Sequence, residues 1–310
     1  MNNKRYAYYS GCSLESTAKE YNDSLKEIFK VLGVEIEEPD DWSCCGSTPA
    51  HTVDPLLACA LGARNLSLIE KMGLETVIAP CPSCFAVLKR AHLKMKKDPE
   101  MRERINELID EPYNLRVSPK SALQILYEDI PPEKISEMAV YEIPELKVVP
   151  YYGCIVTRPK EVAEFDDPEN PISMDRILES AGITVLDFPF KTECCGAAFG
   201  VVKRDVVNKL SSKVLSMAKE VGANCVAVCC PLCQQNLDLR QDQINSLMKT
   251  DFKIPVLYFS QLLGLVFGIS PDKLGINKLV VSAQWIVDSL KKAEKRGKKI
   301  KEEPEAEEEQ

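Results

Sequence analysis

The sequence contains no apolar run long enough to cross a bilayer. The longest, residues 262–269, falls far short of the roughly 20 residues that a spanning helix needs. No glycine-rich nucleotide fingerprint follows any early strand-like segment, so we do not expect the chain to bind NAD or flavin through that fold. The N-terminal residues show no signal peptide and run directly into a strand-like segment. We therefore expect a cytoplasmic protein in a reducing, anaerobic setting.

Positive charge and histidine are also scarce. The 39 Lys and Arg residues are outnumbered by 47 Asp and Glu residues, which gives a net charge of −8. This balance argues against nucleic acid as the main partner. Only two histidines occur, whereas cysteine occurs 13 times among the 310 residues. That frequency lies below the level of a disulfide-stabilised scaffold, so the cysteines need another explanation.

Ten of the cysteines form two sets of five in the same order. Each set consists of a single cysteine, a Cys-Cys-Gly segment and a Cys-Pro-x-Cys segment. Matching residues are 142, 150 and 149 positions apart, which indicates an internal repeat. The first set is Cys12, Cys44, Cys45, Cys81 and Cys84, and the second is Cys154, Cys194, Cys195, Cys230 and Cys233.

The segments around these cysteines favour loops and helix starts. Adjacent residues on a strand point to opposite faces, so a Cys-Cys pair that serves one site must lie in a loop, where the following glycine relaxes the backbone. Adjacent cysteines also stand too close, at about 3.8 Å between Cα atoms, for an ordinary disulfide. Pro82 and Pro231 suit the first turn of a helix. The free N–H groups of that turn lower thiol pKa values and can hydrogen-bond bound sulfur.

Metal binding explains these segments, and the residues alone leave the metal open. Zinc sites and ordinary iron–sulfur clusters both take four ligands, whereas each set offers five thiols. Either one cysteine of each set is spare or the bound group is not a standard cubane. Two zinc sites are one alternative. A thiol–disulfide oxidoreductase is another, but it leaves the Cys-Cys pairs unexplained.

Strand-like and helix-like segments alternate along both halves of the chain. In the first half we expect strands over 5–10, 34–37 and 76–79, helices over about 17–32, 56–72 and 82–96, and a charged link over 97–111. In the second half we expect strands over 146–152, 183–188 and 225–229, and helices over 172–181, 204–221 and 230–248.

This alternation predicts parallel α/β units with ligands at the carboxyl ends of strands. We expect two Rossmann-like halves, residues 1–145 and 146–290, related by a pseudo-twofold axis, with the two metal sites facing each other. Residues 291–310 are basic and then acidic, and we expect this charged tail to be disordered or bound to a partner.

The repeated pattern resembles the cysteine-rich CCG family and, within it, the B-type subunit of heterodisulfide reductase. Further similar stretches are Tyr151–Cys154, Asp166–Pro171, Glu193–Gly200 and Ile254–Gly268. The resemblance implies two non-cubane [4Fe-4S] clusters, each held by all five cysteines of one set, and cleavage of a disulfide between them. It also implies two partners, a ferredoxin-like iron–sulfur subunit of the C type and a flavin subunit of the A type.

Four further residues are candidates for handling substrate and protons. The substrate implied by the resemblance is an anionic disulfide, so an acidic protein needs a local basic pocket for it. Lys203 and Arg204 follow the second Cys-Cys-Gly segment, and Arg158 follows Cys154. His51, six residues after Cys45, is the candidate proton donor.

From the cysteine sets and the resemblance together, we predict that the chain is a catalytic iron–sulfur subunit that reduces a disulfide to two thiols. One alternative is an electron-relay subunit of a lactate-, succinate- or quinone-linked complex, and another is a related reductase that acts on a different disulfide. The cysteines outside the two sets, Cys59, Cys225 and Cys229, are expected in the core. For Cys229, a role beside the ligand Cys230, or in its place, stays open.

Overall fold

The computed structural model describes residues 4–47 and 50–292 and contains two four-stranded parallel sheets. The first sheet has the order β2-β1-β3-β4, and its strands are β1 (Arg5–Tyr8), β2 (Glu35–Glu37), β3 (Thr76–Ile78) and β4 (Ser118–Lys120). The second has the order β6-β5-β7-β8, and its strands are β5 (Lys147–Tyr151), β6 (Thr184–Val185), β7 (Cys225–Val228) and β8 (Val256–Tyr258). The identical order confirms the prediction of two repeated Rossmann-like α/β halves.

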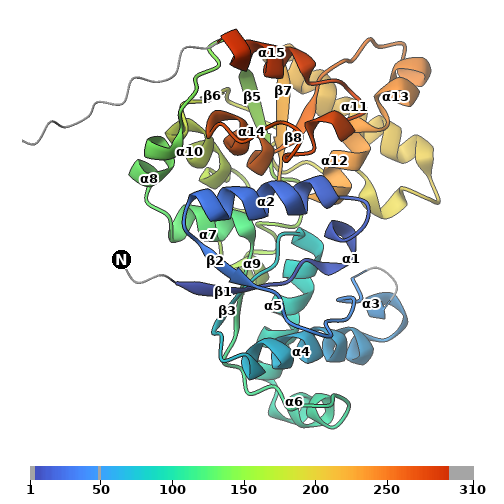
Figure 1. Ribbon diagram of the computed structural model, residues 1–310. Helices are drawn as coiled ribbons and strands as arrows, with labels where there is room; N and C mark the ends of the chain where they lie inside the picture. Colours follow the sequence, from blue (N-terminus) through green and yellow to red (C-terminus); the bar gives the residue numbers. More distant parts are fainter. Residues whose placement is uncertain (1–3, 48–49, 293–310) are drawn as a thin grey trace, which may run out of the picture.

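Helices connect the strands in both halves (Figure 1). Those of the first half are α1 (Gly11–Leu14), α2 (Lys19–Val31), α3 (Ala50–Val53), α4 (Pro55–Lys71), α5 (Pro82–Lys97), α6 (Pro99–Asn106), α7 (Ala122–Glu128) and α8 (Pro132–Met138). Those of the second half are α9 (Lys160–Ala163), α10 (Ser173–Ser180), η1 (Ala197–Phe199), α11 (Arg204–Glu220), α12 (Pro231–Asp238), α13 (Gln241–Met248), α14 (Phe259–Val266), η2 (Ile276–Lys278) and α15 (Gln284–Lys292).

Two predictions about helices are wrong. The segment over 97–111, predicted only as a charged link, contains the helix α6. Asp98 caps its first turn, since the carboxylate accepts the N–H of Met101 at 3.0 Å. The predicted helix over 230–248 is two helices, α12 and α13. The buried amide of Gln241, at the start of α13, bonds both the N–H and the C=O of Ile254 and so ties α13 to the segment that leads into β8.

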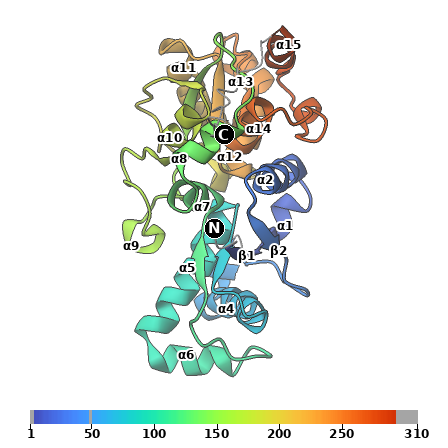
Figure 2. The same cartoon turned by 60° about the vertical axis from the view of Figure 1, so that its left-hand side comes forward.

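The two halves join through equivalent helices. α14 packs on α2, and α10 packs on α7. In the repeat α2 corresponds to α10, and α7 corresponds to α14. A pseudo-twofold rotation that swaps the two halves therefore turns the α2–α14 contact into the α10–α7 contact. The ring of Tyr21 on α2 stacks on that of Tyr258 at 4.2 Å between centroids, and the hydroxyls of Ser24 and Ser260 lie 2.7 Å apart. α2 and α7 lie between the two sheets in both views (Figures 1 and 2).

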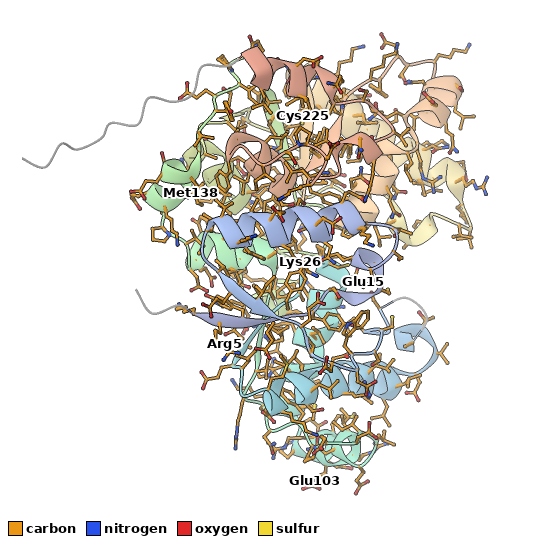
Figure 3. All side chains as sticks on the ribbon, viewed as in Figure 1. Arg5, Glu15, Lys26, Glu103, Met138 and Cys225 are labelled. Carbon is orange, nitrogen blue, oxygen red and sulfur yellow. The ribbon has the colours of Figure 1, made fainter. Side chains whose placement is uncertain are left out.

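The core continues across this junction and through both sheets. Cys225 on β7 is fully buried and lies among the packed side chains of the second half (Figure 3). The label of Lys26 in the same figure locates α2, the helix at which the two halves meet. The strands of the two sheets fall within residues 1–145 and 146–290, although the boundary itself stays a prediction.

Two sequence predictions concern parts of the chain beyond the sheets. Within residues 4–47 and 50–292, no helix combines the length and the apolar character that crossing a bilayer requires. Of the predicted tail, residues 293–310 lie outside the described residues, and α15 ends at Lys292.

Candidate metal centre

The cysteines of each set follow the carboxyl ends of three strands. In the first half Cys12 lies in α1 after β1, the Cys-Cys-Gly segment follows β2, and Cys81 follows β3. The second half repeats this placement after β5, β6 and β7. In parallel α/β sheets, ligands bind beyond the carboxyl ends of strands where the strand order reverses. Both sets lie at such a point. In the first sheet β2 lies on one side of β1 and β3 on the other, and in the second sheet β6 and β7 flank β5 in the same way.

The local geometry predicted for the segments is present in both halves. Cys81 is the N-cap residue of α5 and Cys230 that of α12, and in each case proline occupies the first helical position. The glycines of the Cys-Cys-Gly segments, Gly46 and Gly196, have φ angles of 77° and 82°. These left-handed values are unfavourable for other residues, so glycine is what allows the chain to turn directly after each cysteine pair.

Thiols from separate segments approach one another closely. The Cys45 and Cys84 sulfurs are 3.4 Å apart, and the matching Cys195 and Cys233 sulfurs are 3.6 Å apart. The Cys12 and Cys44 sulfurs are 4.0 Å apart. Two thiolates bound to one tetrahedral metal, at about 2.3 Å each, would stand about 3.8 Å apart. All these cysteines are free, so the distances suit shared metal ligation without a disulfide.

The thiols of each set contact one another in a series and do not surround one point. Cys84 contacts both Cys45 and Cys81, and Cys233 contacts both Cys195 and Cys230. Among the described residues, no three His, Cys, Asp or Glu side chains converge as a single metal ion would require. A closed zinc site needs four ligands around one ion. Each set supplies five thiols, one more than a closed zinc site or a cubane iron–sulfur cluster uses.

Hydrogen bonds within each set favour thiolates, which are the form that binds metal. A hydrogen bond with the Cys84 thiol and weaker ones from the N–H groups at the start of α5 lower the pKa of Cys81 to about 7. In the second half the Cys233 thiol lowers the pKa of Cys195 to about 6. Cys84 and Cys233, the partners in these bonds, have raised pKa values.

Each set has a buried and an exposed side. Cys12, Cys44 and Cys194 are exposed and Cys154 is half-buried. The remaining six are buried, namely Cys45, Cys81, Cys84, Cys195, Cys230 and Cys233. A group bound by all five thiols of a set would therefore be anchored in the core and reachable from one side.

The buried sides of the two sets lie near each other across the junction of the halves. Tyr258 belongs to the second half, and burial raises its pKa well above the usual range. Negative charge nearby raises that pKa further, from Glu20, Cys230, Cys81 and Cys233. One ring thus interacts with thiols of both sets. Cys81 also raises the pKa of Cys229, after burial and the neighbouring Cys230.

Two tyrosines that sequence analysis did not select hold the Cys-Cys-Gly segments. The Tyr9 hydroxyl donates to the C=O of Ser43 at 2.7 Å, and the Tyr151 hydroxyl donates to the C=O of Glu193 at 2.6 Å. Ser43 and Glu193 each directly precede a cysteine pair. A Tyr-x-Gly-Cys pattern occurs in both halves, and comparing the repeats by residue type would have revealed these tyrosines.

The glycine of that pattern provides room for a sulfur. A Cβ atom on Gly11 would stand 3.1 Å from the Cys84 sulfur, and one on Gly153 would stand 2.9 Å from the Cys233 sulfur. Both glycines also have left-handed φ angles, 67° and 72°. Sequence analysis missed this role, because the contact joins segments that are far apart in the chain.

The candidate basic residues differ in what they contact. The Arg158 guanidinium bonds the C=O of Pro168, the carboxylate of Glu169 and the hydroxyl of Thr192, at 2.6–2.8 Å. It therefore ties the 166–171 turn to the segment before Cys194, and its contact with substrate stays a prediction. Lys203 and Arg204 are exposed at the start of α11, where Arg204 lines a shallow cavity of about 490 Å³ between α11 and α13.

The other singled-out residues are simpler to place. His51 lies in α3, and its side chain falls outside the described part of the structure, so its role as proton donor stays a prediction. Cys59 and Cys225 are buried in the core, as predicted. Cys229 is also buried, and its thiol lies 3.5 Å from the C=O of Tyr152.

Comparison with known proteins agrees with this architecture. The chain is 34% identical over 283 residues to the 8-methylmenaquinol:fumarate reductase membrane anchor subunit of Wolinella succinogenes, covering 90% of this chain and 98% of that one. It is 30% identical to the B-type subunit of the ferredoxin/F420H2-dependent CoB-CoM heterodisulfide reductase of Methanosarcina acetivorans, covering 88% of this chain and 93% of that one.

A solved structure and a family model complete the comparison. A hypothetical protein from Helicobacter pylori shares the fold, with a TM-score of 0.71 at 11% identity, over 92% of this chain and 53% of that one. The model of the CCG cysteine-rich domain matches twice, at residues 6–89 and 148–238. The two matches contain both cysteine sets. The chain therefore belongs to the CCG cysteine-rich domain family.

Proposed function

We propose that this chain is the catalytic iron–sulfur subunit of a cytoplasmic complex of the heterodisulfide reductase type. The ten cysteines of its two sets hold two non-cubane [4Fe-4S] clusters, at which a disulfide is reduced to two thiols. The observation that carries the proposal is the occurrence of two complete five-thiol sets at equivalent places beyond the carboxyl ends of the strands in the two halves. Relatives named as B-type subunits of heterodisulfide reductase support it.

The proposed reaction consumes two electrons and two protons for each disulfide: R–S–S–R′ + 2 e⁻ + 2 H⁺ gives RSH and R′SH. When bound, the clusters supply electrons and polarise sulfur. The chain positions the ligands through Tyr9 and Tyr151, and His51 is the candidate donor of a proton. Electrons come from partners, for which we propose a ferredoxin-like subunit and a flavin subunit.

The second Cys-Cys-Gly segment offers a surface for an anionic substrate. Phe199, Val201 and Val202 are exposed directly before Lys203 and Arg204. An apolar strip followed by two cations can pack an aliphatic thiol chain and bind its charged end. The substrate implied for this site is therefore a small disulfide with anionic groups.

Replacing Lys203 and Arg204 together with Gln should raise the KM for an anionic disulfide about tenfold or more, because each charge-assisted hydrogen bond contributes about 1.5–3 kcal/mol. The kcat and the iron content should stay near the parent values, since both side chains are exposed at the start of α11. Lys209→Gln with Lys219→Gln removes the same charge farther along α11 and serves as the control. An equal KM effect in both variants would point to general electrostatics and away from a binding site.

The proposed function is tested on protein purified anaerobically with its partner subunits. We expect iron and sulfide in amounts that account for two clusters on this chain, and reduction of CoM-S-S-CoB with an artificial electron donor. Zinc in place of iron would rule out every iron–sulfur function for the chain.

A second candidate is an electron relay in a quinone-linked complex. It is favoured by the likeness to the menaquinol:fumarate reductase subunit of Wolinella succinogenes, which extends over nearly the whole of that protein. The same assay separates the two functions. Protein with intact clusters that accepts electrons but does not turn over the disulfide would favour the relay.

A further inference from the structure

Asn236 brings a side-chain amide to a cysteine of the second set. The residue lies on α12 and is only 6% exposed. Its Nδ2 group lies 3.5 Å from the Cys195 sulfur and 3.5 Å from the Cys195 C=O. Cys195 therefore receives a side-chain N–H in addition to the N–H of Ala197 in its own loop.

Arg240 determines which end of that amide faces the sulfur. Its Nε donates to Asn236 Oδ1 at 3.0 Å, and its Nη2 donates to the C=O of Gly200 at 3.1 Å. A guanidinium has only donors, so the oxygen of Asn236 must face Arg240 and the NH₂ group must face Cys195. The same arginine thereby connects the amide to the loop that follows the Cys-Cys-Gly segment.

Among the described residues of the first half, the positions matched by the repeat carry no counterpart of this pair. The repeat offset of 149 positions places Val87 opposite Asn236 and Ala91 opposite Arg240. Val87 carries no N–H on its side chain. Ala91 packs against α4 at Gly62, where a Cβ atom on the glycine would stand only 2.8 Å from that of Ala91, so a side chain as long as arginine has no room there. The loop N–H is common to both halves, since that of Ser47 reaches Cys45.

We propose that Asn236, oriented by Arg240, is a positioning residue that makes the two clusters unequal, giving the second-half cluster the higher reduction potential. The inference rests on the proposed function, because it requires a cluster in each half. An N–H dipole directed at a ligand sulfur stabilises added negative charge, and hydrogen bonds to sulfur are among the features that set cluster potentials. Electrons entering the chain would then reside first on the second-half cluster.

The test is a redox titration followed by electron paramagnetic resonance on the anaerobically purified complex. The Cys45→Ala variant, which disturbs the first set, assigns the remaining signal to the second half. In Asn236→Val, which copies the first half, we expect the reduced fraction of the second-half cluster to fall at a fixed potential, with its midpoint moved down. The first-half cluster of the same molecules is the internal reference and should keep its midpoint.

Arg240→Met tests the orienting role, because it leaves the amide in place but frees it to turn. We expect the midpoint potential of the second-half cluster to fall by less than in Asn236→Val. If Asn236→Val loses iron, the midpoint measured in Arg240→Met tests the inference in its place. Unchanged midpoints in iron-replete variants, or equal shifts of both clusters, would overturn the inference. A parent protein that binds no iron would instead overturn the proposed function, and the inference with it.

Discussion

Replacing Cys195 with alanine is expected to remove one of the two proposed clusters and to lower disulfide reduction by more than about 100-fold. The expectation exceeds the 10–100-fold effect typical of removing an outer hydrogen-bond partner of a metal ligand, because the ligand itself is lost. Cys195 is buried, lies 3.6 Å from the Cys233 sulfur and has a lowered pKa, so it meets the requirements for a thiolate ligand. Iron analysis and anaerobic spectra measure the loss.

The fold should survive this substitution. Alanine is smaller than cysteine and leaves the other four thiols of the set, so we expect the free energy of unfolding to fall by only about 1–2 kcal/mol. Cys225→Ala is the matched control, because it removes an equally buried thiol outside the two sets and should keep both clusters. Cys45→Ala should reproduce the loss in the first half. If the Cys45 and Cys195 variants both retained parent iron and spectra, the vicinal cysteines would not both be ligands.

The second large effect is expected from Gly153→Ala. The added methyl group would stand 2.9 Å from the Cys233 sulfur, closer than packed atoms approach, so either the sulfur or the loop after β5 must move. Because the Cys233 thiol contacts both Cys195 and Cys230, we expect the variant to lose the proposed second-half cluster and disulfide reduction, and to keep the first-half cluster.

Gly222→Ala separates this steric effect from backbone strain. Gly222 has a φ angle of 81°, similar to the 72° of Gly153. Apart from its two chain neighbours, however, no described residue has an atom within 4 Å of the position that its Cβ would take. Both variants should lose about 1–2 kcal/mol of stability from the left-handed backbone. Only Gly153→Ala should lose iron. Retention of both clusters there would mean that the Cys233 sulfur tolerates displacement and that its position is not critical for binding.

Some of the architecture could be predicted because the signals are local. The Pro after Cys81 and Cys230 predicts a helix start at each site, and α5 and α12 begin there. The Gly after each Cys-Cys pair predicts a backbone that other residues disfavour, and both glycines have left-handed φ angles. Helix α6 also had a local signal, Asp98-Pro99, but its charged composition, with only Ile105 buried, obscured the amphipathic pattern that normally identifies a helix.

What the sequence by itself determined is therefore the existence of two equivalent thiol sets, their placement after strands and the α/β character of both halves. Only the tertiary structure decided which sulfurs contact one another, how α2 meets α14 while α7 meets α10, and that Asn236 reaches Cys195. The physical reason is distance along the chain. Caps, turns and periodicity depend on neighbours within a few residues. These contacts instead join residues that are 32 to 236 positions apart, and they depend on how all the intervening elements pack.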